Sequence, residues 1–367
     1  MMSQAVIGIL TWRSGTRFSE PAYLRKLVKA GREMGAIVYL FSYQDAYPAK
    51  KQIHGFVPGK NGGWVRRWFP WPDMVIDRYR KRVPGYIRFR HRSHFPYANS
   101  TFSKKWKITK LLTDEIATRQ WIPETVDYSK PRLLHMLKRH QLLYVKPGNG
   151  TGGRSILKVA ATARGYHLQG RDKYQRMRMA RFATEAATAA YVERWVHEQK
   201  IQDGPFMVQQ GLQLSLLPNR VADVRLLIQK DERGEWDVTG LGVRVGAANS
   251  STSNLHGGGR GIPFEKFMQE RFGERAEEIR RECCELAHQT AGTLEKHFGR
   301  MIEFGLDIGI DVDGKVWLIE VNPKPGREIF REMGQLKTYR LAIRRPVEYA
   351  IRLAQETKRR TVRVHHR

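Results

Sequence analysis

The chain has 367 residues, of which 41% are hydrophobic and 10% aromatic, so it is not a disordered protein and is long enough for two or three domains with apolar cores. No apolar run approaches the roughly 18 residues that a membrane helix needs, so we expect no membrane partner. Lysine and arginine number 65 against 36 acidic residues, and the net charge of +29 should attract polyanions.

Residues 1–100 are predicted to form a small N-terminal α/β domain. Val6–Leu10 and Ile37–Phe41 are short apolar runs typical of buried strands. Between them, apolar residues recur at helical spacing over Pro21–Met34. Met74–Ile76 predicts another buried strand.

Polar and basic stretches complete this domain. Residues 44–72 are rich in glycine, proline and lysine, which predicts a loop. From Trp64 to Lys110 the many basic residues face only Asp73 and Asp77, and aromatic residues are interleaved with them. Such a mixture suits single-stranded nucleic acid, but aromatics beside prolines are also typical of local packing. No helix-turn-helix, zinc-finger or RNA-recognition signature is present, so nucleic acid is the weaker alternative.

Residues 101–205 are predicted to form a second unit. Its expected elements are a helix that begins at Lys105, strands at Leu142–Lys146 and Ser155–Val159, and a helix over Thr184–Gln199.

Residues 206–345 are predicted to form a third unit, and 346–367 a basic helical tail. The expected elements of the third unit are strands at Phe206–Gln209, Val224–Gln229 and Val238–Val245, a glycine-rich loop at 249–261, a long helix over 264–298, and closing strands at Gly305–Ile310 and Val316–Val321. Residues 311–314 predict the hairpin turn between the closing strands.

The two cysteines, Cys283 and Cys284, are adjacent in the long predicted helix. They cannot form a disulfide framework or a zinc cage, so buried inert thiols are expected. The apolar run Val6–Leu10 has no basic flank before it and is interpreted as a strand rather than a signal peptide. These features predict a cytoplasmic location.

A glycine loop follows the strand that ends at Lys146. Its glycines allow backbone N–H groups to approach phosphate oxygens, and Lys146 supplies a positive charge for the α- or β-phosphate. The order of residues is not that of a P-loop. The alternative is a glycine-rich hairpin beside a solvated lysine.

Three oxygen-bearing side chains, Asp307, Glu320 and Asn322, lie on the two closing strands. Glu320 and Asn322 are two residues apart and share a strand face, and Asp307 can converge on them from the neighbouring strand. Magnesium bound to a triphosphate needs such ligands. The alternative is a pair of surface acids, but Glu320 lies in an apolar run where an unpaired carboxylate is costly.

Two arginines, Arg225 and Arg244, lie on successive predicted strands and could flank a phosphoryl group in transfer. The planar fork of arginine binds phosphate or carboxylate at two points. Because surface arginines are common in this chain, a purely structural role is the alternative for each of them. His256 is interpreted as a loop residue rather than as a base.

The order of these motifs resembles that of ATP-grasp enzymes, over roughly residues 95 to 335. The motifs are Lys105-Trp106, Lys146 with its glycine loop, Asp223-x-Arg225, Arg244, Asn254-Leu255-x-Gly-Gly, and Asp307 followed by Glu320-x-Asn322. The span from Asn254 to Gly258 is similar to ribosomal-protein glutamate ligases. The amino-acid sequence around Lys105, at Val208–Gly211 and at Gly305–Asp311 resembles the YheC/YheD family of endospore coat-associated proteins more closely still.

This resemblance implies an α/β (α+β) ATP-grasp fold: an N-terminal pre-ATP-grasp domain at 1–100, a small subdomain at 101–205 and a large subdomain with the metal site at 206–345. It also implies ATP and Mg²⁺ (or Mn²⁺) as cofactors. Asp307, Glu320 and Asn322 would hold the metal, and Arg225 and Arg244 would be catalytic, orienting the acyl-phosphate or the acceptor carboxylate. The nucleotide would contact Lys105, Lys146, Gly148, Gly150, Thr151, Gly152, Gly153, Gln209, Gln210, Gly211, Asp223 and Asn254. Gln209 to Gly211 would be the hinge that reads adenine through its backbone, although Gln209 and Gln210 stand where the family usually has an acid for the ribose.

The sequence therefore predicts an ATP-dependent carboxylate–amine (or thiol) ligase that acts through an acyl-phosphate. Family naming points to spore-coat formation, with an acidic peptide or a spore-coat protein as the partner and the spore coat as a second location. Two alternatives stay open: a structural coat protein that binds nucleotide without turnover, and a basic protein that binds polyanions.

Overall fold

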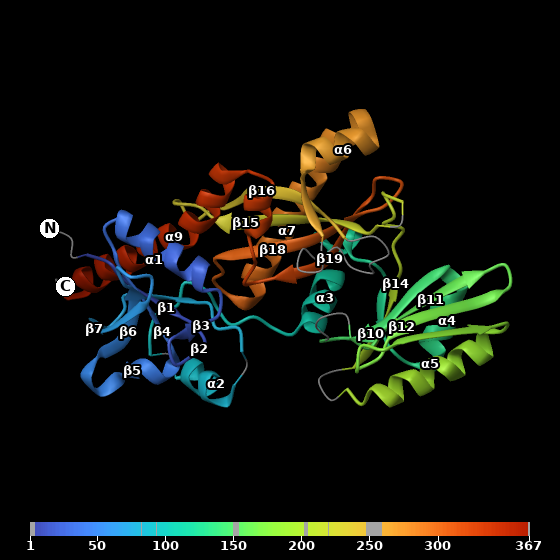
Figure 1. Cartoon of the computed structure of the whole chain (residues 1–367), viewed down its shortest axis with the longest axis horizontal. Coiled ribbons are helices and arrows are strands. Elements are labelled where there is room, and N and C mark those ends of the chain that lie inside the picture. The colour runs from blue at the N-terminus through green and yellow to red at the C-terminus, as the bar shows by residue number, and fades with distance from the viewer. Residues whose placement is uncertain are drawn as a thin grey trace.

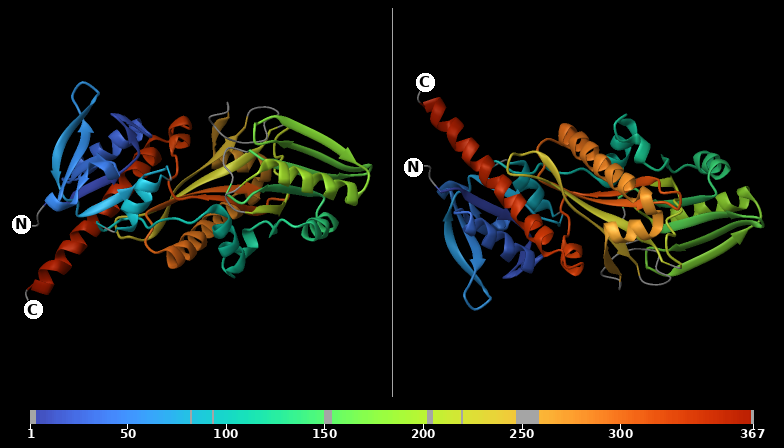
Figure 2. Two further views of the ribbon diagram at one scale, coloured as in Figure 1. Left: turned by 90° about the horizontal axis from the view of Figure 1, so that it is seen from below. Right: turned by 90° about the horizontal axis from the view of Figure 1, so that it is seen from above.

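The computed structural model describes residues 4–81, 83–92, 94–149, 154–201, 205–218, 220–246 and 259–365. These residues form three sheet-based lobes in a row, and both ends of the chain lie at the outer end of the N-terminal lobe (Figures 1 and 2). The mixed α and β architecture is the one the sequence predicts. Among the described residues, no helix has the length and apolar character needed to cross a membrane.

The N-terminal lobe is built on a six-stranded sheet whose parallel centre is β4-β1-β8. β1 (Val6–Leu10), β4 (Ile37–Phe41) and β8 (Met74–Asp77) are apolar runs with both faces covered, and α1 (Pro21–Glu33) crosses between the first two. The predicted strands and helix are confirmed here. The small elements β2 (Arg13–Ser14), β3 (Arg17–Phe18) and α2 (Pro84–His91) border this sheet.

The prediction of a loop over 44–72 is wrong. This stretch contains β5 (Ala46–Tyr47) and the hairpin of β6 (Gln52–Pro58) and β7 (Trp64–Pro70). The glycines gather in the hairpin turn, where Gly62 has φ of +73°. Most residues of β7 are exposed, so its basic composition hides the strand pattern.

Helix α9 (Leu336–His365) packs across the N-terminal lobe (Figure 1). Val347, Ala350 and Leu353 are buried in the same core as α1. Gly31 allows this approach, because a Cβ there would lie 3.1 Å from the Cγ1 of Val347. The start of the predicted tail therefore belongs to the N-terminal core rather than to a separate segment.

The second lobe, at the other end of the molecule, is a six-stranded antiparallel sheet with helices on one face (Figure 1). In spatial order its strands are β13 (Met177–Phe182), β12 (Gly165–Arg171), β11 (Ile156–Thr162), β10 (Leu142–Pro147), β14 (Phe206–Gln210) and β9 (Thr125–Asp127), and its helices are α4 (Lys130–Arg139) and α5 (Glu185–Gln199). The side chain of Thr184 accepts a hydrogen bond from the N–H of Ala187 and so caps α5. Because β14 pairs with both β10 and β9, the boundary expected at 205/206 lies inside this sheet instead of at its edge.

The third lobe, in the middle of the molecule, is a five-stranded antiparallel sheet. Its strands in spatial order are β17 (Arg260–Pro263), β16 (Trp236–Val245), β15 (Ala222–Lys230), β18 (Glu303–Ile310) and β19 (Val316–Asn322). α6 (Phe264–Phe272) and α7 (Ala276–Phe298) pack on one face, and α3 (Lys105–Asp114) adds Ile108 and Leu112 to the same core. The single long helix predicted over 264–298 is broken at Gly273, whose φ of +54° ends α6. Cys283 is buried in this core and Cys284 is half-buried, and both are free thiols.

The other face of the third sheet is covered at one end only. There α8 (Glu328–Glu332) and α9 approach closely, since a Cβ on Gly240 would lie 2.9 Å from the ring of Phe330. Toward the opposite end, the same face carries charged side chains in place of apolar ones.

Candidate active site

Strand register brings the predicted charged residues of the third sheet together. Asp223 pairs with Arg244, Arg225 with Asp307, and Asp307 with Glu320. Directly paired residues place their side chains on the same face of a sheet. Four neighbouring strands therefore each contribute to one polar cluster.

Arg244 is the fixed centre of this cluster. It is 5% exposed, and its Nε and Nη2 donate to the two carboxylate oxygens of Asp223 at 2.7 and 2.5 Å. Its Nη2 also lies 3.1 Å from Oδ2 of Asp307. Burial lowers the pKa of Arg244, but the hydrogen bonds and charges of the two aspartates outweigh it and hold the pKa above its ordinary value. Asp223 thus holds Arg244 in place, and its oxygens are directed at this arginine rather than outward.

Asp307 lies between the two arginines. Its Oδ1 accepts a hydrogen bond from Nε of Arg225 at 2.8 Å, while its Oδ2 faces Arg244. Both arginine side chains and Asp307 are largely buried. The predicted catalytic arginines are therefore brought together, but both are paired with carboxylates.

Helix α3 delivers Lys105 to the edge of this cluster. Its Nζ lies 2.9 Å from Oε1 of Glu320, and both side chains are partly exposed. Asn322, two residues further along β19, is also half-exposed and pairs with Gly305. A Cβ on Gly305 would lie 2.6 Å from Cβ of Pro325, so glycine lets the chain after Asn322 fold back over the sheet.

Lys146 approaches the same cluster from the second lobe. Its Nζ donates to Oε1 of Gln209 at 2.5 Å, and Nε2 of Gln209 donates to Oγ1 of Thr125 at 2.8 Å. Burial lowers the pKa of Lys146 to about 8; the charge of Glu320 raises it and that of Lys105 lowers it. The two lysines and Glu320 therefore form one electrostatic group at the junction of the two lobes.

The glycine loop after Lys146 is described only at its start. Gly148 donates its N–H to the carbonyl of Pro205 at 2.8 Å, and a Cβ there would lie 3.0 Å from Cβ of Trp106. Glycine is thus required for contact between the loop, α3 and the segment before β14. The predicted contacts Gly150, Thr151, Gly152, Gly153 and Asn254 lie outside the described residues, as does His256.

The predicted hinge strand is already hydrogen-bonded within the protein. The N–H groups of Gln210 and Gly211 donate to the carbonyls of Glu124 and Leu142 at 2.8 and 2.7 Å. The side chain of Gln210 accepts from the N–H of Glu124 at 3.3 Å. These two N–H groups are therefore in use and do not present free donors to an adenine edge.

The donor set suits a hard cation. Asp307, Glu320 and Asn322 offer carboxylate and amide oxygens on one sheet face, the ligands that Mg²⁺ or Mn²⁺ prefers. Among the described residues no cluster of three or more His, Cys, Asp or Glu could hold a metal, so a site here must include the amide of Asn322. The Lys105–Glu320 ion pair is more exposed to solvent than the ion pairs of Asp307, so it is screened more strongly. Of the two carboxylates, Glu320 is therefore the easier to free from its basic partner for metal binding.

Sequence analysis did not predict that the N-terminal lobe reaches this site. Arg80 donates a hydrogen bond at 2.7 Å to the carbonyl of Lys324, which lies two residues beyond Asn322. Arg80 also donates to Glu20, at the start of α1. Glu20 has φ of +56°, and such strain at a non-glycine residue is often associated with function. Only the folded arrangement joins residues so far apart in the chain.

Comparison with known proteins supports the motif-based expectation. The family model described as YheC/D like ATP-grasp matches residues 94–353. Endospore coat-associated protein YheD of Bacillus subtilis (strain 168) is 27% identical over 346 residues, which cover 91% of this chain and 74% of YheD. Endospore coat-associated protein YheC of the same strain is 24% identical over 336 residues, which cover 87% of this chain and 89% of YheC.

A solved structure has the same fold. D-alanyl-alanine synthetase A from Vibrio cholerae O1 biovar eltor str. N16961 matches with a TM-score of 0.53 and 12% identity, over 95% of this chain and 99% of that chain. The predicted ATP-grasp fold is confirmed by these comparisons.

Proposed function

The chain belongs to the YheC/D-like ATP-grasp family, and we propose that it is an ATP- and Mg²⁺-dependent ligase that joins a carboxylate to an amine or a thiol. One observation carries the proposal: Lys105 and Lys146 come from different elements and meet Glu320 at the junction of two lobes. Two lysines around one half-exposed carboxylate, one of them with a lowered pKa, mark this junction as a candidate functional site.

The two lysines would bind the phosphates of ATP. Lys146 is held by Gln209, so its ammonium group is already oriented before nucleotide binds. A polyphosphate beside it would raise its pKa again and keep it protonated. Lys105 would leave Glu320 and contact phosphate, because the pair is exposed and separable.

Asp307, Glu320 and Asn322 would hold Mg²⁺ or Mn²⁺. When bound, the metal would neutralise phosphate charge and orient the γ-phosphate. Arg225 orients Asp307 from one side, and Arg244 orients it from the other. Asp223 acts through Arg244, so we assign it a positioning role in place of direct contact with nucleotide.

The proposed reaction has two steps. A carboxylate oxygen of the substrate attacks the γ-phosphorus, and the bond to the bridging oxygen breaks to release ADP. An amine or thiol then attacks the carbonyl carbon of the acyl-phosphate, phosphate leaves, and the proton of the nucleophile passes to solvent or phosphate. Arg225 and Arg244 would orient the acyl-phosphate, and positioning and charge stabilisation supply most of the catalysis in such chemistry.

The names of YheD and YheC motivate the biological setting. We place the activity in spore-coat formation, in the cytoplasm or at the coat, with an acidic peptide or coat protein as substrate. One observation favours a coat protein that binds nucleotide without turnover: both oxygens of Asp307 are already paired with arginines.

An ADP-release screen tests the proposal. The protein with Mg²⁺ and ATP is offered single amino acids, peptides and polyglutamate, and release should appear with a carboxylate substrate and vanish with EDTA. Glu320→Gln should abolish release, whereas Glu193→Gln, an exposed acid on α5, should not. ATP binding without release on any substrate would favour the non-catalytic alternative.

A further inference from the structure

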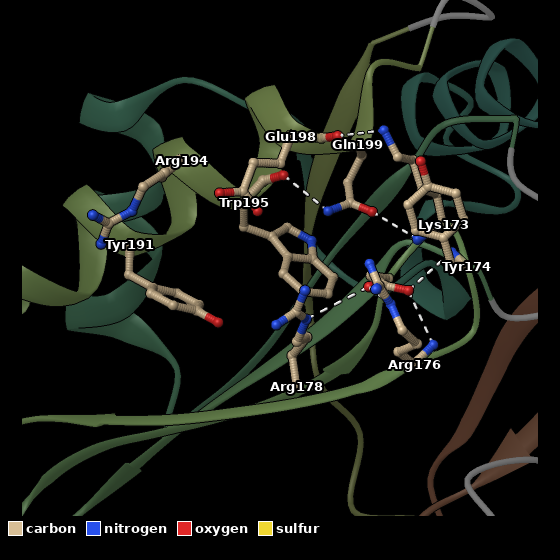
Figure 3. Close-up of a pocket in the computed structure, with 10 residues that line it drawn as sticks. Lys173, Tyr174, Arg176, Arg178, Tyr191, Arg194, Trp195, Glu198 and Gln199 are labelled. Atoms are coloured by element: carbon tan, nitrogen blue, oxygen red, sulfur yellow. Dashed lines mark hydrogen bonds and ion pairs between the residues drawn. The ribbon is translucent and has the colours of Figure 1, made fainter.

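A cavity of about 380 Å³ lies between the C-terminal half of α5 and the segment that joins β12 to β13. Trp195 and Gln199 form its helical wall, and Arg176 and Arg178 lie opposite them (Figure 3). Asp172 also lines the cavity. The cavity opens on the lobe that carries Lys146 but belongs to other elements.

This cavity is separate from the candidate active site. Leu143 and Val145 of β10 point into the core beneath α4 and α5. Side chains alternate along a strand, so Lys146 points to the opposite face of the sheet. The cavity lies on the helix-covered side, and a ligand there would not occupy the nucleotide site.

Basic side chains outnumber acidic ones around the cavity. The charged groups that line it are Lys173, Arg176, Arg178 and Arg194 against Asp172 and Glu198. Asp172 is already well satisfied. It accepts from the N–H groups of Tyr174 and Arg176 at 2.9 and 3.0 Å and from Nε of Arg176 at 3.0 Å.

A structural role explains only part of this set. The bonds to Asp172 fix the turn before β13, and Nζ of Lys173 donates to the carbonyl of Glu198 at 2.9 Å. Arg178, by contrast, approaches Asp172 only through Nε, at 3.5 Å. Within the described ranges, the terminal nitrogens of Arg178 and the nitrogens of Arg194 have no hydrogen-bond acceptor, and the guanidinium of Arg194 lies over the ring of Tyr191. These guanidinium groups can bind an anion at two points.

Trp195 provides a second, independent sign of a missing ligand. The side chain is 3% exposed, and its Nε1 is a buried donor without an acceptor in the described part of the chain. Leaving a buried donor without a partner is unfavourable, so an acceptor oxygen supplied by a ligand would recover free energy. The ligand should therefore carry oxygen acceptors as well as negative charge.

The edge of the sheet beside the cavity suits an extended chain. β13 is the last strand of its sheet, so one side of its backbone is unpaired. Met177 and Met179 are 46% and 61% exposed on this strand, and Arg178 lies between them. A peptide could pair with the free edge, place apolar groups on the methionines and send an acidic side chain toward Arg178.

We propose that the cavity between α5 and β13 binds the carboxylate side chains of an acidic peptide, and so docks the peptide substrate away from the site of chemistry. The docking role rests on the proposed ligase function, whereas binding itself requires no turnover. The high positive charge of the chain would favour such a partner in solution.

Fluorescence anisotropy with a labelled oligoglutamate peptide tests this inference. Arg178→Ala with Arg194→Ala should weaken binding about tenfold or more, the effect of losing charge-assisted hydrogen bonds. As a control, Arg164→Ala removes one positive charge from the exposed β11–β12 turn and should change affinity less than about twofold. Circular dichroism and Mg-ATP affinity should match the unmodified protein in each variant.

The inference would be overturned by an equal loss in the Arg164→Ala control, by no loss in the double variant, or by an oligothymidylate that binds as tightly with the same dependence on Arg178. Displacement of the peptide by millimolar inorganic phosphate would assign the site to free phosphate instead. Hydrogen exchange should slow at residues 172–178 and 191–199 when the peptide binds, and unchanged exchange there would also refute the site.

ADP release separates this inference from the proposed function. Free glutamate is too small to need the docking site, so the double variant should keep any release that free glutamate supports. Peptide binding that requires Arg178 without ADP release on any substrate would refute the ligase and leave the docking site. If ADP is released but peptide binding does not depend on Arg178, the docking site is refuted and the ligase proposal stands.

Discussion

Replacement of Lys146 by methionine should stabilise the folded protein and weaken nucleotide binding. Methionine is close to lysine in shape but carries no charge. The fall in the pKa of Lys146 from 10.5 to about 8 corresponds to a cost of about 3 kcal/mol for keeping the ammonium group charged in the folded state at pH 7. Loss of the hydrogen bond to Gln209 offsets about 1 kcal/mol of this, so Lys146→Met should gain about 2 kcal/mol.

The stability difference between Lys146→Met and the unmodified protein should depend on pH. Between pH 8 and 10.5 the unfolded chain still holds the proton that folded Lys146 has lost, so the stability of the unmodified protein rises over this range. Lys146→Met cannot show this rise. Its advantage should therefore be largest at pH 7 and shrink as the pH approaches 10.

Urea denaturation followed by circular dichroism measures both effects, and calorimetry measures nucleotide affinity. Mg-ATP affinity should fall by about 1.5–3 kcal/mol, the scale of a lost charge-assisted hydrogen bond. Lys130→Met, an exposed lysine on α4, is the matched control and should change neither quantity. Equal unfolding free energies for Lys146→Met and the unmodified protein at pH 7 would refute the buried-charge reasoning.

Three further predictions concern the same site. Glu320→Gln should weaken Mg-ATP binding measured by calorimetry with the fold intact by circular dichroism, while Glu193→Gln should leave the affinity unchanged. Arg225→Lys should lower the ADP-release rate more than ATP affinity, because its predicted partner is the acyl-phosphate; parallel losses would mean that it binds only the γ-phosphate. Gly148→Ala should lower both stability and nucleotide affinity by about 1–3 kcal/mol, because the new Cβ meets Trp106 and a carbonyl at 3.0 Å, whereas Gly63→Ala points into open space and should be neutral in thermal unfolding.

The elements that the sequence predicts well are those with both faces buried. β1 and β4 agree with the expected bounds to the residue, because continuous apolar runs mark strands that are covered on both sides. β7 and β13 were missed for the converse reason: each lies at the border of its sheet and exposes charged side chains. Their strand character comes from backbone pairing with a neighbour, which leaves little trace in composition.

The candidate site divides in the same way. The proximity of Asp307 and Glu320 follows from one hairpin, so local register was enough to predict it. The pairing of Arg225 with Asp307 joins positions 82 residues apart, and no local pattern specifies which strand lies beside β15. Sequence reasoning therefore selected residues that the fold brings together, but it treated both arginines as free, whereas the structure pairs each with an aspartate.

The carboxylates of the site are each paired with a cation before any nucleotide is present. Glu320 is paired with Lys105, and Asp307 with Arg225 and Arg244, so a metal ion alone would have to displace a cation to bind. A triphosphate alone would bring negative charge next to Glu320 and Asp307. Each ligand favours binding of the other, because the metal would bind the carboxylates while the phosphates would bind Lys105. Mg²⁺ and ATP should therefore bind cooperatively to this chain, beyond the affinity they have for each other in solution.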